Sequence, residues 1–510
     1  MALNDIIFVK GQGGLGRPLE GEDYISGLLS YVATLPSGFS STDRIKLLTS
    51  LQDAVSLGIN NTYSDSTAAT GTYTVTTAGT TGDTVQLKVA AINELGIATT
   101  YDLGTYTKVA GDSSTANVAT AIAAVINSNT YLNGFSASAT SAAVTITAPK
   151  RFGVWLNTAT TPISATLSSG ATLAGTIAQF SSGTVSTNAV LYYHISEFFR
   201  LQPKGLLYVG LYAVPGTYTF AEIQTIQDFS GGKIRQIGIF KDGTFASGDL
   251  TTIQGVCNTV AGLHKPLSAI YAGNIKATSD LTTLTNLANL TASNVSAVIG
   301  QDGAGQGNYL YLTQGKSITC LGATLGAVAY SKVSEDIAWL SKFNISNGAE
   351  CDTIKFANGT DIASASQNLL NLLDNYRYIF LIKYVGIAGS YFNDSHCAVA
   401  VTSDYAYIEN NRTIDKAIRG VYSSLLPNLN SPLQLNANGT LTDNTVSYFE
   451  SQAAINLYEM VRNSELSAFQ VLINPTQNVL STNNLTVAIK LVPIGVARQI
   501  TVNIGFTLSI

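Results

Sequence analysis

Three short stretches of the chain contain the residue types that phosphate binding or nucleophilic catalysis requires. Residues 11–16 read G-Q-G-G-L-G, which matches the glycine spacing of a dinucleotide-binding turn. Residues 314–317 read Q-G-K-S, which is similar to the end of a phosphate-binding P-loop. Residues 394–397 read D-S-H-C and place a carboxylate, an imidazole and a thiol next to one another. Each of these chemistries depends on a scaffold that positions the groups.

None of the three stretches has the scaffold that its chemistry needs. The sequence R-P-L follows the third glycine of residues 11–16, where the dinucleotide fingerprint requires a helix to open. Leu310 replaces the first glycine of the P-loop pattern, so we expect Lys316 to lie in solvent at the start of a helix. Successive residues of a strand point to opposite faces, which separates the groups of residues 394–397. We therefore expect no enzymatic activity, no cofactor and no metal site.

The composition narrows the class of protein. Only 12% of the 510 residues are charged while 45% are hydrophobic, so the surface is weakly charged and suits extensive contact with protein neighbours. Lys and Arg total 27 against 32 acidic residues, with no basic run, which argues against a nucleic-acid binder. No apolar stretch reaches the ~18 residues that a membrane helix requires, and the N-terminus lacks the features of a signal peptide. The four cysteines are scattered, as expected of reduced thiols made in a cytosol: Cys257, Cys320, Cys351 and Cys397.

Strand-like and helix-like segments alternate through the middle of the chain. The predicted strands are 205–214, 234–240, 267–272 and 294–300, and the helices that follow them are 220–229, 248–263, 279–291 and 317–341. This order is typical of a parallel sheet with helical crossovers. Two further helices are predicted at 22–33 and 42–57.

Residues 60–190 differ in composition from the rest of the chain. Charged side chains are few there, and short alternating runs such as T-Y-T-V-T and A-V-T-I-T indicate strands. One Ala-rich helix is predicted near 116–127. We interpret this segment as a compact β-rich domain inserted into another domain, and we expect its two ends to lie close together.

The C-terminal region predicts further strands, two helices and a closing hairpin. The expected strands are 378–385, 398–401 and 485–491, and the expected helices are 446–462 and one that is capped by Thr413 and runs to Leu426. The strand at 485–491 and the last residues of the chain are predicted to pair as a long hairpin.

The last residues of the chain alternate with the period of a strand. Every second residue is apolar: Ile500, Val502, Ile504, Phe506, Leu508 and Ile510. A free apolar strand is a pairing hazard, whereas burial of six such side chains would contribute roughly 10 kcal/mol. Two interpretations stay open at this point. The segment is an internal strand of its own chain, or it docks into a neighbouring copy by β-augmentation.

Several long stretches resemble the tail sheath proteins of contractile-tailed bacteriophages. The longest are S-D-Y-A-Y-I-E-N-N-R-T-I-D-K-A-I-R-G-V-Y-S-S-L-L-P at 403–427 and N-P-T-Q-N-V-L-S-T-N-N-L-T-V-A-I-K-L-V-P-I-G-V-A-R-Q-I-T-V-N-I-G-F at 474–506. Residues 298–303, 325–344 and 379–394 are similar to the same family, as is G-G-L-G-R-P-L near the N-terminus. The resemblance covers about residues 1–58 and 191–510, and no family motif occurs in 60–190.

The resemblance implies a multidomain fold of mixed α/β and α+β class. The expected parts are an N-terminal arm (1–20), a parallel-sheet α/β core (21–59 and 191–345), an inserted β-rich surface domain (60–190), a C-terminal α+β sheath domain near the tail tube (346–496) and a C-terminal arm strand (497–510).

The resemblance also implies a structural role without a cofactor. Sheath subunits form hexameric rings that stack helically around a tail tube, together with baseplate and tail terminator proteins. Contraction of such a sheath drives the tube through the host envelope for genome ejection. The expected protein is a component of a virion tail, made in the host cytoplasm, with no nucleic-acid ligand and no membrane insertion.

The family scheme assigns roles to three sets of residues. Terminal strands of neighbours complete a sheet in each subunit, which implies the inter-subunit arm residues Ile6, Ile7, Phe8, Val9, Ile500, Val502, Ile504, Phe506 and Leu508. A hinge of the N-terminal arm is implied at Gly11, Gly13, Gly14 and Gly16. Candidate contacts to the tube or to the next ring, with a solvated helix face as the alternative, are Arg412, Asp415, Lys416 and Arg419.

Three other classes of protein remain open from the sequence. The sheath of a bacterial contractile injection system has the same kind of subunit as a phage tail. A flavodoxin-like enzyme would explain the strand–helix repeats, although a fold does not by itself give a function. A non-contractile shell or surface protein would explain the low charge and the β-rich insert.

Overall fold

The computed structural model describes residues 22–507, and its centre is a seven-stranded sheet with the strand order β17-β14-β12-β11-β1-β10-β2. Five neighbouring pairs are parallel, and the edge pair β10–β2 is antiparallel. The strands are β1 (Ile25–Val32), β2 (Ile45–Leu48), β10 (Leu206–Ala213), β11 (Gln236–Thr244), β12 (Ser268–Asn274), β14 (Val295–Val298) and β17 (Tyr378–Ile379). Every residue of β1 and β14 is buried, as expected of a parallel sheet that is covered on both faces.

Helices cover this central sheet. They are α1 (Leu51–Ser56), α5 (Thr187–Leu201), α6 (Glu222–Phe229), α7 (Ser247–Gly262), α8 (Gln306–Thr313), α9 (Leu321–Tyr330) and α10 (Gln367–Asn375). Helix α9 packs closely on α5 because Gly322 has no side chain: a Cβ there would lie 2.1 Å from the carbonyl oxygen of His194. This contact buries His194 in the centre of the molecule.

Short elements complete the middle of the molecule. They are η2 (Leu281–Thr283), η3 (Leu287–Asn289), β13 (Thr291–Ala292), β15 (Gly300–Asp302), β16 (Ile354–Phe356), η4 (Ile362–Ser364), β18 (Leu381–Ile382), β19 (Tyr391–Phe392) and β20 (Ala398–Val399). The pairs β13–β20, β15–β16 and β18–β19 are antiparallel.

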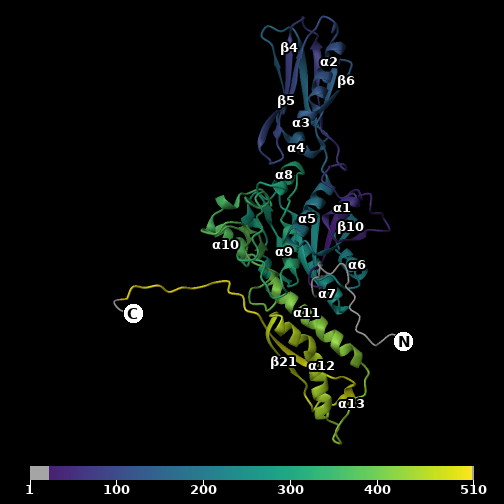
Figure 1. Cartoon of the computed structure of the whole chain (residues 1–510), viewed down its shortest axis with the longest axis vertical. Helices are drawn as coiled ribbons and strands as arrows, with labels where there is room; N and C mark the ends of the chain where they lie inside the picture. Colours follow the sequence, from purple (N-terminus) through teal and green to yellow (C-terminus); the bar gives the residue numbers. More distant parts are fainter. Residues whose placement is uncertain (1–21, 508–510) are drawn as a thin grey trace, which may run out of the picture.

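Residues 70–181 form two antiparallel sheets at one end of the elongated molecule (Figure 1). The sheets have the orders β6-β7-β3-β9 and β5-β4-β8, and α2 contacts strands of both. The elements are β3 (Thr70–Thr77), β4 (Thr84–Ile92), β5 (Ala98–Thr107), α2 (Thr115–Ser128), α3 (Thr130–Asn133), β6 (Ser136–Thr140), β7 (Ala143–Thr147), η1 (Lys150–Phe152), α4 (Trp155–Thr158), β8 (Ile163–Leu167) and β9 (Ala174–Ser181).

The two ends of this β-rich segment lie side by side, as the sequence predicted. The Thr184 amide donates to the Thr67 carbonyl at 3.1 Å, and the Thr67 amide donates to the Thr184 hydroxyl at 2.7 Å. The base of the segment rests on α8, where the Val154 amide donates to the carbonyl of Thr313 at 2.9 Å. The chain therefore leaves the central part and returns to it at one place.

The opposite end of the molecule is built from helices and a hairpin (Figure 1). Its elements are α11 (Ile408–Leu425), η5 (Leu426–Asn428), α12 (Asp443–Arg462), β21 (Leu466–Leu472), α13 (Val479–Thr482) and β22 (Ala488–Pro493). Strands β21 and β22 are antiparallel, and Phe469 and Ile489 join an apolar cluster with Leu457 and Met460 of α12.

The structure corrects two elements predicted near the N-terminus. Residues 22–33, predicted as a helix, contain strand β1, because its apolar residues are buried on both faces of the sheet. Residues 42–57 divide into β2 and the short helix α1, whose capping box joins Ser50 and Asp53.

Four predicted elements farther along the chain also differ. Residues 279–291 contain η2 and η3, and the long helix predicted at 317–341 is confined to α9, because Ser331 adopts an extended backbone. Helix α11 begins at Ile408, so Thr413 lies inside it and is no cap. The predicted terminal hairpin is wrong: β22 pairs with β21, and residues 494–507 have no regular secondary structure.

Candidate assembly interface

The C-terminal segment carries an uncovered row of apolar side chains. In Figure 1 the chain extends away from the body of the molecule in yellow toward its C-terminus. Ile500, Val502, Ile504 and Phe506 are 79%, 68%, 91% and 113% exposed, and Leu508 lies outside the described residues. As far as residue 507, the segment is therefore not an internal strand of its own subunit. Such exposed apolar rows mark interaction sites in soluble proteins.

A groove of suitable form lies between α12 and β21. Apolar and polar side chains line it in similar measure: Ala454, Tyr458, Val461, Ala468, Phe469 and Val471, with Ser447, Glu450, Ser451 and Ser467. Within residues 22–507, β21 has β22 as its one strand partner, so its other edge presents unpaired backbone groups. An added strand requires an open strand edge, and the apolar residues of the groove beside it could receive alternate side chains of that strand.

The root of the C-terminal segment is held by Arg498. Its guanidinium contacts three carboxylates, with Nε 2.9 Å from Asp394 Oδ2 and Nη2 3.1 Å from Asp336 Oδ2 and 2.5 Å from Glu409 Oε1. The guanidinium carbon also lies 3.5 Å from the centre of the Tyr407 ring. We name these five residues the Arg498 cluster. Burial, together with Glu409 and Asp394, raises the pKa of Asp336 to about 8.

The four charged residues predicted to contact the tube or the next ring lie on α11, and the structure leaves Lys416 and Arg419 partly exposed. Arg412 and Asp415 are buried, and burial raises the pKa of Asp415 to about 6. Lys416 Nζ lies 2.6 Å from Asp23 Oδ2, and Arg419 Nη2 lies 3.6 Å from Asp23 Oδ1. The expectation of an accessible surface is therefore corrected for Arg412 and Asp415.

Asp23 contacts three cationic side chains of α11, and together these residues form a second cluster. Besides the two ion pairs, Arg412 Nη2 donates to the Asp23 backbone carbonyl at 3.2 Å. Burial opposes ionisation of Asp23, but Lys416 and Arg412 outweigh it and lower the pKa of this carboxyl. We name Asp23, Arg412, Lys416 and Arg419 the Asp23 cluster. The sequence indicated it only through the spacing of three, four and three from Glu409 to Arg419, which places Glu409, Arg412, Lys416 and Arg419 on one helix face.

The residues predicted for the second arm lie outside the described part of the chain. They are Ile6, Ile7, Phe8 and Val9, with the hinge glycines Gly11, Gly13, Gly14 and Gly16. Their assignment stays a prediction, as does the expectation that residues 11–16 bind no dinucleotide.

The P-loop-like stretch has a structural role. Lys316, expected in solvent, is buried, and its Nζ lies 2.5 Å from Asp242 Oδ1. The Ser317 hydroxyl donates to the carbonyl of Ala357 at 2.6 Å. Helix α9 begins only at Leu321, so no glycine-rich loop leads from a strand into a helix here.

The thiol of the D-S-H-C stretch is not activated as a nucleophile. Cys397 is buried, and burial raises the pKa of its thiol to about 12, so it stays protonated near neutral pH. His396 Nε2 lies 2.8 Å from Asp374 Oδ1, away from the sulfur. Across residues 22–507, no group of three or more His, Cys, Asp or Glu side chains is arranged to hold a metal.

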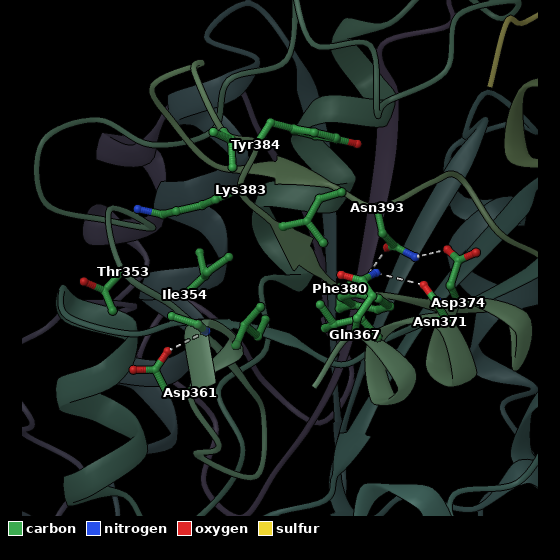
Figure 2. A pocket seen from close by; sticks show the side chains of 15 residues that line it. Thr353, Ile354, Asp361, Gln367, Asn371, Asp374, Phe380, Lys383, Tyr384 and Asn393 are labelled. Atoms are coloured by element: carbon green, nitrogen blue, oxygen red, sulfur yellow. Dashed lines mark hydrogen bonds between the residues drawn. The ribbon is translucent and has the colours of Figure 1, made fainter. Parts of the chain in front are cut away.

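A hollow of about 670 Å³ lies beside α10 and β18 (Figure 2). Its polar groups already have partners: Asn393 Nδ2 donates to Asp374 at 2.8 Å, and Asp361 accepts the amide of Ala363 at 2.9 Å. Among its described lining residues, no nucleophile stands beside a base. None of the helices in the described part of the chain is long and apolar enough to cross a bilayer.

Two family models match the chain. "DUF2586, N-terminal domain" matches residues 3–396, and "DUF2586, C-terminal domain" matches residues 404–510. Because these matches cover most of the sequence, the chain belongs to the DUF2586 family.

Several solved structures are similar to the chain. A subunit of the anti-feeding prophage helical sheath in the contracted state is 13% identical, with 62% of this chain and 81% of that chain covered and a TM-score of 0.44. The sheath complex of the extracellular contractile injection system PVC, also in the contracted state, is 15% identical, with 62% of this chain and 80% of that chain covered and a TM-score of 0.42. The sheath tail protein of Desulfitobacterium hafniense is 10% identical, with 96% of this chain and 100% of that chain covered and a TM-score of 0.36. No curated protein matches the chain.

Proposed function

We propose that this protein is the structural subunit of a contractile tail sheath. One observation carries the proposal: an alternating apolar segment projects uncovered from a subunit that has an open strand edge beside a partly apolar groove. The long sequence stretches that resemble phage sheath proteins support the same function. No catalytic constellation competes with it among the described residues.

The projecting segment docks into a neighbouring copy. Residues 499–507 enter the groove between α12 and β21 of that copy and add a strand to β21, with Ile500, Val502, Ile504 and Phe506 toward the floor. Because every copy both donates a segment and accepts one, such contacts are heterologous and generate rings or helical filaments. The N-terminal segment forms the second link of the mesh.

The finer parts of the proposal follow from the sheath resemblance. Hexameric rings stack around a tail tube between baseplate and terminator proteins in a virion tail. The extended assembly is metastable, and contraction exchanges it for a packing with more buried contact. The β-rich segment at one end of the molecule faces outward, away from the tube, and Lys416 and Arg419 remain candidate tube contacts.

Negative-stain imaging of the purified full-length protein tests the proposed function. We expect helical tubes of stacked rings that form above a threshold concentration. The I504D variant places a carboxylate on the apolar row and should prevent tubes, whereas N503D places the same group on the neighbouring polar position and should permit them. Flat sheets, closed shells or a persistent monomer that binds a small ligand would contradict the sheath function.

A further inference from the structure

Helix α11 turns its most charged face toward the interior of the subunit. Glu409 and Arg412 are buried, and Lys416 and Arg419 on the same face are largely covered. In contrast, Ile418 on the other side of the helix is exposed. A buried charge is tolerated only when its partners are present, so the role of this face depends on the groups that pair with its charges.

This face binds both described ends of the chain. Near its start, Glu409 belongs to the Arg498 cluster, from which the C-terminal segment leaves the body. One to three turns farther along, Arg412, Lys416 and Arg419 hold Asp23, the second residue after the segment 1–21. The two clusters differ in charge: three carboxylates surround one cation at the C-terminal root, whereas at the N-terminal root Lys416 and Arg419 face the Asp23 carboxylate and Lys416 also pairs with Glu465 at 2.6 Å.

A second element connects the two clusters. The loop that follows α9 supplies Asp336 to Arg498, and its Ser331 accepts hydrogen bonds from Arg412 through the hydroxyl at 2.7 Å and the carbonyl at 3.3 Å. Both clusters therefore rest on the same helix and the same loop. Opening of the Arg498 cluster removes the cation that faces Glu409, and opening of the Asp23 cluster leaves Lys416 with Glu465 alone and takes one acceptor from Arg412.

We propose that α11 is a shared anchor that couples the two terminal segments, so that displacement of one root loosens the other. The inference rests on the proposed function, in which both segments link neighbouring subunits. In such a mesh, the shared anchor transmits a load from one link to the other through a single helix. Interdependence of the two links is the expected property of the assembled sheath.

Trypsin digestion of the unassembled full-length subunit tests the coupling. Trypsin cuts the Arg498–Gln499 bond only when the Arg498 side chain leaves its cluster, so the cutting rate reports the open population. We expect D23N, which does not touch Arg498, to accelerate this cut by tenfold or more, and D23E to restore the parent rate. E459Q is the matched control, because among residues 22–507 the ion-pair partner of Glu459 is the exposed Arg462 on α12. Cleavage after Arg200 of α5 serves as the control for global unfolding.

The reverse direction is measured by hydrogen exchange. We expect R498Q to accelerate exchange over residues 412–419, because coupling between two sites is reciprocal. Parent rates in both experiments, a change in one direction only, or equal acceleration at Arg200 would overturn the shared anchor. If D23N is insoluble, K416Q is judged by the same criteria. Both readouts use free subunits, so they test the coupling independently of assembly. A failure to form tubes would refute the sheath function but would not decide whether the two clusters are coupled.

Discussion

Substitution of Ile504 by Asp distinguishes two interpretations of the C-terminal segment. The segment is either donated to a neighbouring subunit or belongs to the core of its own subunit. Ile504 is 91% exposed in the free subunit, so I504D should change the free energy of unfolding by no more than about 0.5 kcal/mol, as at other surface positions. A shift of that size moves the melting temperature by only about 1–2 °C in a domain of moderate size.

The effect on assembly is expected to be far larger. Burial of an isoleucine side chain contributes roughly 1.5–3 kcal/mol, and an unpaired buried carboxylate costs several kcal/mol more. A combined loss of about 5 kcal/mol for each contact corresponds to a roughly thousandfold or greater weakening, since each 1.4 kcal/mol is a factor of ten. Because every copy makes the contact, sedimentation should find I504D monomeric at concentrations where the parent polymerises.

N503D controls for the added charge, because Asn503 is the neighbouring residue on the polar side of the alternation. It should assemble at a threshold within about tenfold of the parent's, since a surface substitution changes a contact by about 0.5 kcal/mol or less. The reasoning is refuted if I504D melts well below N503D in the monomeric state, which would place Ile504 in its own core. It is equally refuted if I504D and N503D polymerise alike.

Three further predictions concern the rest of the molecule. Replacement of residues 68–183 by a short Gly/Ser linker should leave a folded subunit that still assembles, because hydrogen bonds join the flanking residues; loss of assembly with an intact melting transition would assign this segment to a subunit contact. Burial lowers the pKa of His194 to about 3, so as the pH falls below ~6.5 the unfolded state binds a proton before the folded state does. Denaturation at pH 5 should show a loss of about 2 kcal/mol in the free energy of unfolding, and H194F should remove this loss. An unchanged pH profile in H194F would show that another group is responsible. K316A should lower stability by about 1–3 kcal/mol by leaving Asp242 unpaired, and calorimetry should detect no nucleotide binding in parent or variant; saturable binding that K316A abolishes would restore the P-loop interpretation.

Local sequence patterns predicted the elements whose environment is uniform along the chain. The apolar runs of β11, β12 and β14 were recognised because these parallel strands are buried on both faces over most of their length, and β10 was recognised by an equally apolar run although Leu206 and Tyr208 are only half-buried. Strand β1 was mistaken for a helix, since I-S-G-L-L-S-Y-V also fits a helical stripe, and only its pairing between β10 and β11 decides the matter. That pairing joins residues about 180–210 positions apart, which no local pattern contains.

The candidate interface also has one part that a local sequence pattern predicted and another part that depends on residues distant in the sequence. The alternation from Ile500 to Phe506 is local, and it predicted an apolar edge that the structure leaves uncovered. The charged face of α11 was interpreted as an accessible surface, because its partners are distant: Lys416 and Asp23 are 393 positions apart. Charges at helical spacing do not reveal whether water or the far end of the chain lies opposite them.

Electron cryomicroscopy of the assembled protein tests the central claim most directly. The sheath proposal predicts a helical tube in which residues 499–507 of one subunit lie in the groove between α12 and β21 of a neighbour and extend the sheet of that neighbour. An assembly in which these residues fold back onto their own hairpin, or one in which the groove stays empty, would contradict it.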